Sequence, residues 1–119
     1  MNVLEIFRDS PKARSVAAGD VLFRRGETAS EMYVVLEGKV DVTIDGRLVE
    51  TLEPGSILGE MGIVDQGPRS ADAIAATDAR IEVIDKAWFC TLIKRAPEFG
   101  LHVMSVMAER LRRHMQQVA

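Results

Sequence analysis

Residues 15–85 consist of short apolar runs separated by turns that contain glycine or charged residues. In the segment 40–44 apolar and polar residues alternate, which is the pattern of a strand with one buried face. The run 33–36 is apolar at every position, as expected for a strand buried on both faces. Many short strands separated by such turns are typical of an antiparallel sandwich or barrel.

The dipeptide Asp45-Gly46 predicts a β-hairpin, because both residues readily adopt the positive φ angles of a primed turn. Further strands are expected at 71–76 and 79–84, joined by a turn at Thr77-Asp78. The fold class we predict is therefore mainly β, an antiparallel β-roll of the jelly-roll type.

Helical spacing appears on both sides of this β region. Asp85 is a good N-cap, and the apolar residues of 86–95 recur at the spacing that buries one helix face. A second helix is expected from Pro97 to about Gln117, and the apolar residues of 3–7 predict one or two turns of helix at the start. We predict a single domain over 1–119, with the roll at about 15–85 and the C-terminal helices at about 86–118.

Composition narrows the possible functions. A chain of 119 residues has the usual length of a single domain. Its formal net charge of −3 provides no positive electrostatic field that would attract nucleic acid, so direct DNA binding is not expected. No apolar run approaches the ~18 residues of a membrane span. One cysteine and a charged N-terminus without signal-peptide character indicate a cytoplasmic protein. Cys90, beside Trp88 and Phe89, is expected to be a small core residue.

Enzymatic chemistry is not indicated by the sequence. His102 and His114 lack the close spacing of a helical metal pair, and no serine lies in a nucleophile elbow. We therefore expect no catalytic activity, no metal and no cofactor.

The stretch Pro54–Ala71 carries the candidate site. Four glycines, at 55, 59, 62 and 67, allow its backbone to approach a ligand closely. Arg69 offers a planar fork of donors that matches phosphate oxygens, and Glu60 offers an acceptor for sugar hydroxyls. The pair predicts a phosphate-binding group beside a ribose-binding group, although Arg69 by itself could be an ordinary surface arginine after a turn proline.

The segments Gly59–Ile63 and Pro68–Ala71 resemble the phosphate-binding cassette of the cyclic-nucleotide-binding domain family. That family includes the sensor domain of the catabolite activator protein, the regulatory subunits of cyclic-nucleotide-dependent kinases and cyclic-nucleotide-gated channels. Supporting similarities extend along almost the whole chain, at Ala18–Glu27, Met32–Val40 and Leu52–Gly55.

The resemblance implies that cyclic AMP or cyclic GMP is the ligand and that its binding shifts the C-terminal helices. The ligand-binding residues that it implies are Gly59, Glu60, Met61, Arg69, Ser70 and Ala71. Val42 and Val49 align with positions that face the purine in the family, but core valines would look the same. In the family, a serine at the position of Ser70 is compatible with either base, and we favour cyclic AMP as the ligand.

Asp72 departs from the family pattern, because relatives often carry a hydroxyl or apolar residue there. An aspartate close to a phosphate would repel it, although strand alternation is expected to turn Asp72 away from the face that carries Ala71. Two alternatives therefore stay open: an interaction or dimerisation module that does not bind nucleotide, and the truncated sensor domain of a transcription regulator. Besides the cyclic nucleotide, the partner that the resemblance implies is an unidentified protein effector.

The last predicted helix carries an apolar stripe at steps of three and four residues. Such a stripe can form the seam of a two-stranded coiled coil or can pack on its own roll. We predict a homodimer through this helix, with Arg110, Arg112 and Arg113 near its outer end, where one of them could reach the base. The stripe comprises Leu101, Met104, Ala108, Leu111, Met115 and Val118.

Overall fold

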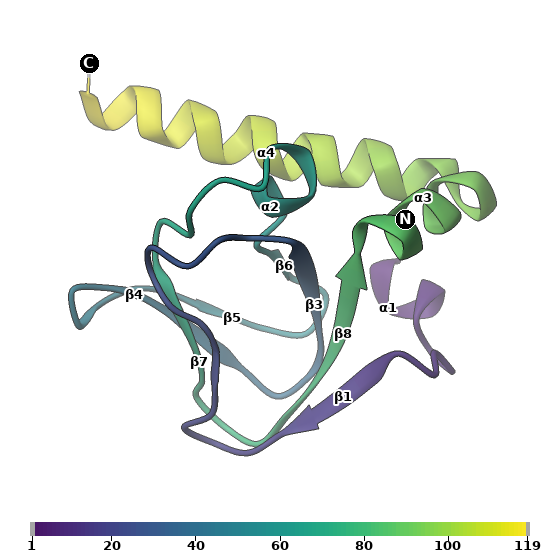
Figure 1. Ribbon diagram of the computed structural model, residues 1–119, viewed down its shortest axis with the longest axis horizontal. Helices are drawn as coiled ribbons and strands as arrows, with labels where there is room; N and C mark the ends of the chain where they lie inside the picture. Colours follow the sequence, from purple (N-terminus) through teal and green to yellow (C-terminus); the bar gives the residue numbers. More distant parts are fainter. Residues whose placement is uncertain (1, 119) are drawn as a thin grey trace.

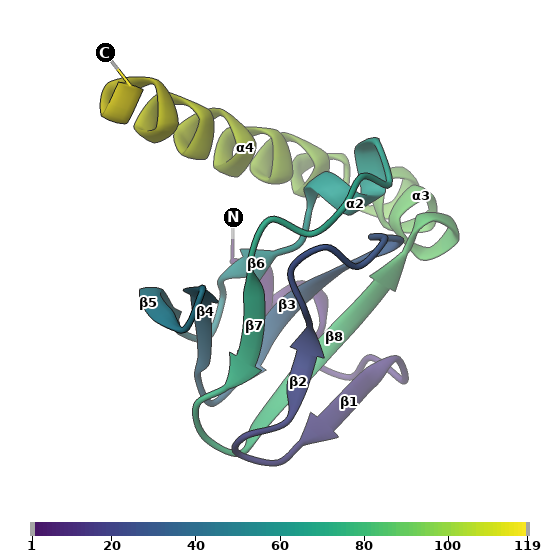
Figure 2. The ribbon, with the colours of Figure 1, turned by 60° about the vertical axis from the view of Figure 1, so that its left-hand side comes forward.

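A computed structural model describes residues 2–118 (Figures 1 and 2). Two four-stranded antiparallel sheets form a β-roll, with strand orders β1-β8-β3-β6 and β2-β7-β4-β5. The predicted β-roll with a short N-terminal helix and C-terminal helices is confirmed. The elements in chain order are α1 (Val3–Ile6), β1 (Ala13–Val16), β2 (Val21–Phe23), β3 (Glu31–Glu37), β4 (Val40–Ile44), β5 (Arg47–Leu52), β6 (Ile57–Leu58), α2 (Met61–Val64), β7 (Asp72–Ala75), β8 (Ala79–Asp85), α3 (Lys86–Arg95) and α4 (Pro97–Val118).

The turn between β4 and β5 is the predicted primed hairpin. Asp45 has φ 52° and Gly46 has φ 77°, so both residues adopt the left-handed conformation that this turn type requires. Asp45 also accepts a hydrogen bond from Arg25 Nη1 at 3.1 Å, which ties the hairpin to the loop after β2. The sequence signal and the tertiary contact therefore favour the same turn.

Strand β3 is apolar from Met32 to Leu36 because its two faces belong to two different cores. Met32, Val34 and Leu36 point into a core shared with α1, α3 and α4. Tyr33 and Val35 point into the interior of the roll, which is lined by residues from both sheets. A strand with both faces covered loses the alternation of polar and apolar residues.

The helices close the first core. Phe7, which follows α1, meets Phe99 of α4 edge to face, with ring centroids 5.6 Å apart. Asp85 caps α3 as predicted, accepting a hydrogen bond from the Trp88 amide at 2.8 Å. The expectation for Cys90 is wrong: this residue is exposed, because it lies on the side of α3 opposite the stripe that contains Leu92.

Glu82 on β8 is a fully buried carboxylate beneath the helices. Its Oε2 accepts hydrogen bonds from Ser10 Oγ at 2.7 Å and from Trp88 Nε1 at 2.9 Å. Because a buried acceptor is costly to leave unpaired, these bonds favour one placement of the N-terminal segment and of α3 on the sheet. The carboxylate thus joins both chain segments to the sheet.

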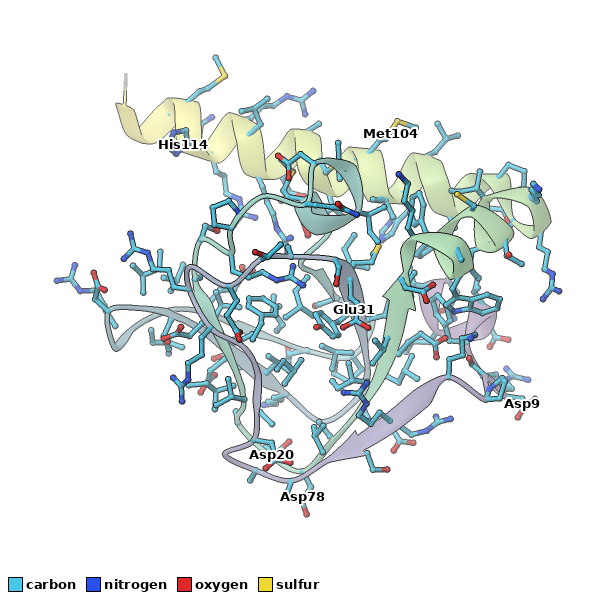
Figure 3. The ribbon with its side chains drawn as sticks, in the orientation of Figure 1. Asp9, Asp20, Glu31, Asp78, Met104 and His114 are labelled. Atoms are coloured by element: carbon cyan, nitrogen blue, oxygen red, sulfur yellow. The ribbon has the colours of Figure 1, made fainter. Side chains whose placement is uncertain are left out.

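Helix α4 has two apolar faces, and only one of them packs on the roll. Phe99 and Val103 are buried, and Val106 and Met107 are half-buried beside them. The predicted stripe lies on the outer side, where its four large members are 58% to 67% exposed: Leu101, Met104, Leu111 and Met115. Figure 3 shows Met104 pointing away from the roll. Ala108 is half-buried, and the side chain of Val118 lies outside the described part of the structure.

No helix in the described part of the chain is both long and apolar enough to cross a membrane.

Candidate functional site

The predicted cassette lies where β6 gives way to α2, beneath α4 (Figure 1). Gly59 directly follows β6 and has φ +72°, a conformation that an L side chain rarely adopts. Glu60 directly precedes α2, and Arg69 follows the loop that leads to β7. The fold therefore brings the two ends of the glycine-rich stretch together.

Arg69 is the buried cation of this site, with 8% of its surface exposed. Its Nη1 donates to the Gly59 carbonyl at 3.1 Å and its Nη2 donates to the Glu31 carbonyl at 2.7 Å. The backbone is fixed as well, because the Arg69 amide donates to the Glu27 carbonyl and its own carbonyl accepts from Gly26, both at 2.8 Å. The guanidinium is thus held from two sides.

The Arg69 guanidinium lies against two aromatic rings. Its Cζ lies 4.3 Å from the centroid of Phe23 and 5.6 Å from that of Tyr33, and the two rings are stacked on each other. Burial raises the pKa of the Tyr33 phenol, and the nearby Glu31 carboxylate raises it further, so this phenol stays neutral at physiological pH. Glu31 begins β3, at the end of the strand nearest the helices (Figure 3).

Within the described part of the chain, no carboxylate oxygen lies within 4.0 Å of the Arg69 guanidinium. In the described structure the guanidinium bonds to two carbonyl groups and lies against two aromatic rings. A guanidinium has five N–H donors, and the two carbonyl bonds leave donors for a further acceptor. Because burying an unpaired charge is costly, this arrangement favours the arrival of an anion.

Glu60 is 2% exposed and is already paired. Its Oε1 accepts a hydrogen bond from Arg110 Nη1 of α4, and Arg110 Nη2 donates to the Ile57 carbonyl at 2.8 Å. The acidic residue that the sequence assigns to a ribose hydroxyl therefore bonds with an arginine that lies 50 residues further along the chain. Arg112 and Arg113, the other two arginines near this end of α4, are exposed.

The remaining predicted site residues differ in their surroundings. Met61 and Ser70 are exposed beside the cassette, whereas Ala71 is buried. Val42 is half-buried against the interior core of the roll. Val49 is exposed and is the extra residue of a β-bulge, since Val42 pairs with Glu50 and Thr43 pairs with Leu48. The purine-facing role of both valines stays a prediction.

Asp72, the residue that departs from the family pattern, has a partner in the fold. Its Oδ1 accepts a hydrogen bond from the Arg25 amide at 2.7 Å, which fastens the loop after β2 to the start of β7. Ala71 is buried and Asp72 is half-buried, as strand alternation requires. The aspartate therefore has a structural reason to be present beside the cassette.

Four residues of the site were missed or not assigned by sequence reasoning. Phe23 and Tyr33 looked like ordinary core residues, Glu31 contributes mainly its carbonyl, and Arg110 was one of three arginines. The pattern of apolar residues indicates that Phe23 and Tyr33 face the interior, but it cannot show that a cation lies against their rings. A backbone carbonyl leaves no signal in the sequence.

A surface hollow of about 460 Å³ lies elsewhere, where β1 meets the turn before β8. Asp78 marks its position, far from α2 and α4 in Figure 3. Its lining includes Glu37 and Arg80, neither of which is fully buried. The hollow is open and contains none of the cassette residues.

We expect Gly59→Ala to destabilise the protein more than Gly55→Ala does. Both glycines have positive φ, so both substitutions introduce backbone strain of about 1 kcal/mol. A Cβ at Gly55 meets no atom within 4 Å, whereas one at Gly59 would lie 2.6 Å from Arg69 Nη1. Urea unfolding of the two variants measures the difference, and equal losses of stability would contradict a tight contact between Gly59 and Arg69.

A family model described as "Cyclic nucleotide-binding domain" matches residues 13–96. The chain is 32% identical over 106 residues to a CRP-like cAMP-activated global transcriptional regulator of Mycobacterium tuberculosis, covering 85% of this chain and 47% of the regulator. It is 35% identical over 81 residues to a cAMP-dependent protein kinase regulatory subunit of Eremothecium gossypii, covering 68% of this chain and 18% of that subunit.

The crystal structure of the Thermus thermophilus catabolite activator protein superposes with a TM-score of 0.82 at 30% identity, covering 98% of this chain and 55% of that one. The chain thus spans about half the length, or less, of these relatives. The family match covers every strand of the roll and all of α3, and it includes both Glu60 and Arg69. The chain therefore belongs to the cyclic nucleotide-binding domain family.

Proposed function

We propose that this chain is a cyclic-nucleotide sensor whose cassette binds the ligand through Arg69 and Glu60. The observation that carries the proposal is the buried Arg69 guanidinium, which has unused donors and no carboxylate within 4.0 Å in the described structure. A cyclic phosphate would receive the free N–H groups, and the ribose 2′-hydroxyl would donate to Glu60. The role is binding and signalling, with no chemical step.

The amides of Ser70 and Ala71 would complete the phosphate site, and Gly59 and Met61 would line its edge. We propose cyclic AMP as the preferred ligand, since two of the relatives are named for cAMP. A serine at position 70 is compatible with either base. The ligand would change the position of α4 only to the extent that it binds one helix arrangement more tightly than the other.

Isothermal titration of the wild-type chain tests the proposal. Cyclic AMP should release or absorb heat with a single site per chain, cyclic GMP should bind more weakly, and linear 5′-AMP is the control for non-specific phosphate binding. A preference of tenfold or more for cyclic GMP would overturn the choice of base. The absence of both heat and thermal shift at millimolar cyclic nucleotide would overturn the sensor function.

A second function is favoured by a specific observation. Glu60 is already paired with Arg110, so the acidic residue of the cassette has a partner without a ligand. An interaction or dimerisation module that binds no nucleotide would have the same contact between Glu60 and Arg110.

The chain also spans only 47% of the mycobacterial regulator. A sensor segment of a longer regulator, with its effector elsewhere, is therefore a further form of the proposal.

We also propose a homodimer through the outer face of α4. Its four large apolar residues are spaced as in a coiled-coil seam and are exposed in the isolated chain. A second copy of the same helix offers a matching surface, which a two-fold interface requires.

A further inference from the structure

The turn formed by residues 24–27 directly follows β2 and holds the backbone of Arg69. The Gly26 amide donates to the Arg69 carbonyl and the Arg69 amide donates to the Glu27 carbonyl, both at 2.8 Å. The residue before the turn is Phe23, whose ring centroid lies 4.3 Å from Cζ of the guanidinium. The position of Arg69 and the ring that its charge lies against therefore both depend on where this turn lies.

The backbone pairing that attaches this turn to the neighbouring segment is interrupted. Strands β2 and β7 pair as far as Phe23, and the next backbone hydrogen bond between the two segments joins Gly26 to Arg69. Between these two points the Arg25 amide donates to Asp72 Oδ1 at 2.7 Å. The Asp72 side chain thus provides the acceptor where backbone pairing is interrupted.

A negative charge at position 72 is unfavourable for a phosphate site. Asp72 lies close to Arg69 in the sequence and is half-buried, so solvent screens its charge only in part. A carboxylate near a bound cyclic phosphate repels it. A carboxylate also accepts a stronger hydrogen bond from an N–H group than a neutral oxygen does. The repulsion and the bond affect ligand affinity in opposite directions, and variants can separate them.

Two side-chain contacts hold the turn 24–27 from outside. One joins the Arg25 guanidinium to Asp45 at 3.1 Å, but both side chains are exposed, and such ion pairs contribute little. The other is the bond from the Arg25 amide to Asp72. Without this carboxylate the amide would bond to water, and the exposed turn would be free to move away from β7. Because the turn holds the Arg69 backbone, such movement would displace the guanidinium.

We propose that Asp72 is a positioning residue of the phosphate site, which raises the affinity for cyclic nucleotide by fixing the turn 24–27 and, through it, Arg69. This inference rests on the proposed function. The effect of the carboxylate passes through the Arg25 amide, and the gain from a fixed Arg69 exceeds the loss from repulsion of the phosphate. The residue that departs from the family pattern thus supports binding.

Three substitutions at Asp72 separate the bond from the charge. Asp72→Ala removes both and should weaken cyclic AMP binding about tenfold, as expected if the turn then holds Arg69 correctly in about one-tenth of the molecules. Asp72→Asn keeps an acceptor oxygen without the charge and should bind nearly as tightly as the wild type. Asp72→Glu keeps the charge, but its longer side chain moves the oxygen away from the Arg25 amide, so it should bind as weakly as the alanine variant.

Titration calorimetry with cyclic AMP measures these affinities, and the comparison of the asparagine and glutamate variants decides the question if the alanine variant does not fold. Asp78 provides a matched control. Its Oδ1 also accepts a hydrogen bond from a backbone amide distant in sequence, that of Ala18 at 2.9 Å, and Figure 3 shows it far from α2 and α4. Asp78→Ala removes the same charge and the same kind of bond, so it should leave the affinity unchanged.

Amide hydrogen exchange tests the contact without a ligand. The amides of Arg25, Gly26 and Arg69 should exchange faster in Asp72→Ala than in the wild type, because all three belong to the contact between the turn and the segment before β7. Asp72→Asn should retain most of the protection of these amides, and Asp78→Ala should retain all of it. Unchanged exchange in Asp72→Ala would contradict the role of this carboxylate in fixing the turn.

The binding results distinguish this inference from the proposed function. Tighter binding by both Asp72→Ala and Asp72→Asn would show that the carboxylate acts only by repelling the phosphate, and it would overturn the inference. Equal affinity of Asp72→Ala and the wild type would also overturn it, while the proposed function would stand. If the wild type binds no cyclic nucleotide, both fail, and faster exchange in Asp72→Ala would then assign the contact to stability alone.

Discussion

Arg69→Ala is expected to weaken cyclic nucleotide binding by a factor of about 30 to 5,000, which corresponds to ~2 to 5 kcal/mol for removing one partner of a buried charge pair. The effect is large because Arg69 is the only group of the cassette proposed to neutralise the phosphate. A charge-assisted hydrogen bond in a site with little water is stronger than its exposed counterpart. Calorimetric titration with cyclic AMP measures the loss directly.

The same substitution should also lower stability, because Arg69 has partners without the ligand. Its bonds to the carbonyls of Gly59 and Glu31 would be lost, and the ring of Phe23 would lose its covering group. We expect a loss of about 1 to 3 kcal/mol in urea unfolding. Binding must therefore be compared at a temperature where all variants are folded.

Two further variants separate charge from geometry. Arg69→Lys keeps the charge but lacks the planar fork, so it should recover only part of the affinity. Arg14→Ala removes an exposed arginine from β1 and should leave binding unchanged. If Arg69→Ala binds cyclic AMP as tightly as the Arg14 control does, the phosphate is not held at Arg69 and the proposed site is wrong.

The parts of the fold that depend on local sequence were predicted correctly. The Asp45-Gly46 turn, the Asp85 cap and the bounds of α3 each follow from residues within a few positions of one another. The double-sided burial of β3 also followed from its uninterrupted apolar run. Such features are determined by backbone conformation and by the period of the apolar residues, both of which the sequence displays directly.

The contacts that define the state of the site were not predictable in this way. Arg110 and Glu60 are 50 positions apart, and three arginines near the end of α4 offered equivalent candidates. The bonds from Arg69 to two backbone carbonyls depend on the path of the chain and leave no trace in residue type. Cys90 was wrongly placed in the core because aromatic neighbours in sequence point to a different side of a helix.

The two apolar faces of α4 show the same limit of sequence reasoning. The spacing identified Leu101, Met104, Leu111 and Met115 as one stripe, but a coiled-coil seam and a roll-packing face have the same spacing. In the structure the roll is covered by a different set, which includes Phe99 and Val103. The alternative prediction, that the stripe packs on its own roll, is therefore wrong for these four residues. Their exposure is what makes a second copy the proposed occupant.

Leu111→Glu is expected to convert a dimer of this chain into a monomer. Leu111 lies within the exposed stripe, between Ala108 and Met115, so the proposed interface would bury its side chain against the partner helix. Burying a carboxylate there without a partner costs several kcal/mol, and two-fold symmetry places two such charges in one seam. In the monomer the same glutamate is exposed, so the fold itself should be little affected.

Sedimentation equilibrium measures this change, with the wild type expected at twice the chain mass and Leu111→Glu at the chain mass. Gln116→Glu is the matched control, because it adds one negative charge at an exposed position of the same helix outside the stripe. It should remain dimeric. Since association depends on concentration, all three proteins are compared over the same range, with and without cyclic AMP. A wild type that stays monomeric throughout would contradict the homodimer and would assign the exposed stripe to a different protein partner. A Gln116→Glu variant that also dissociates would show that net charge, not the apolar seam, controls association.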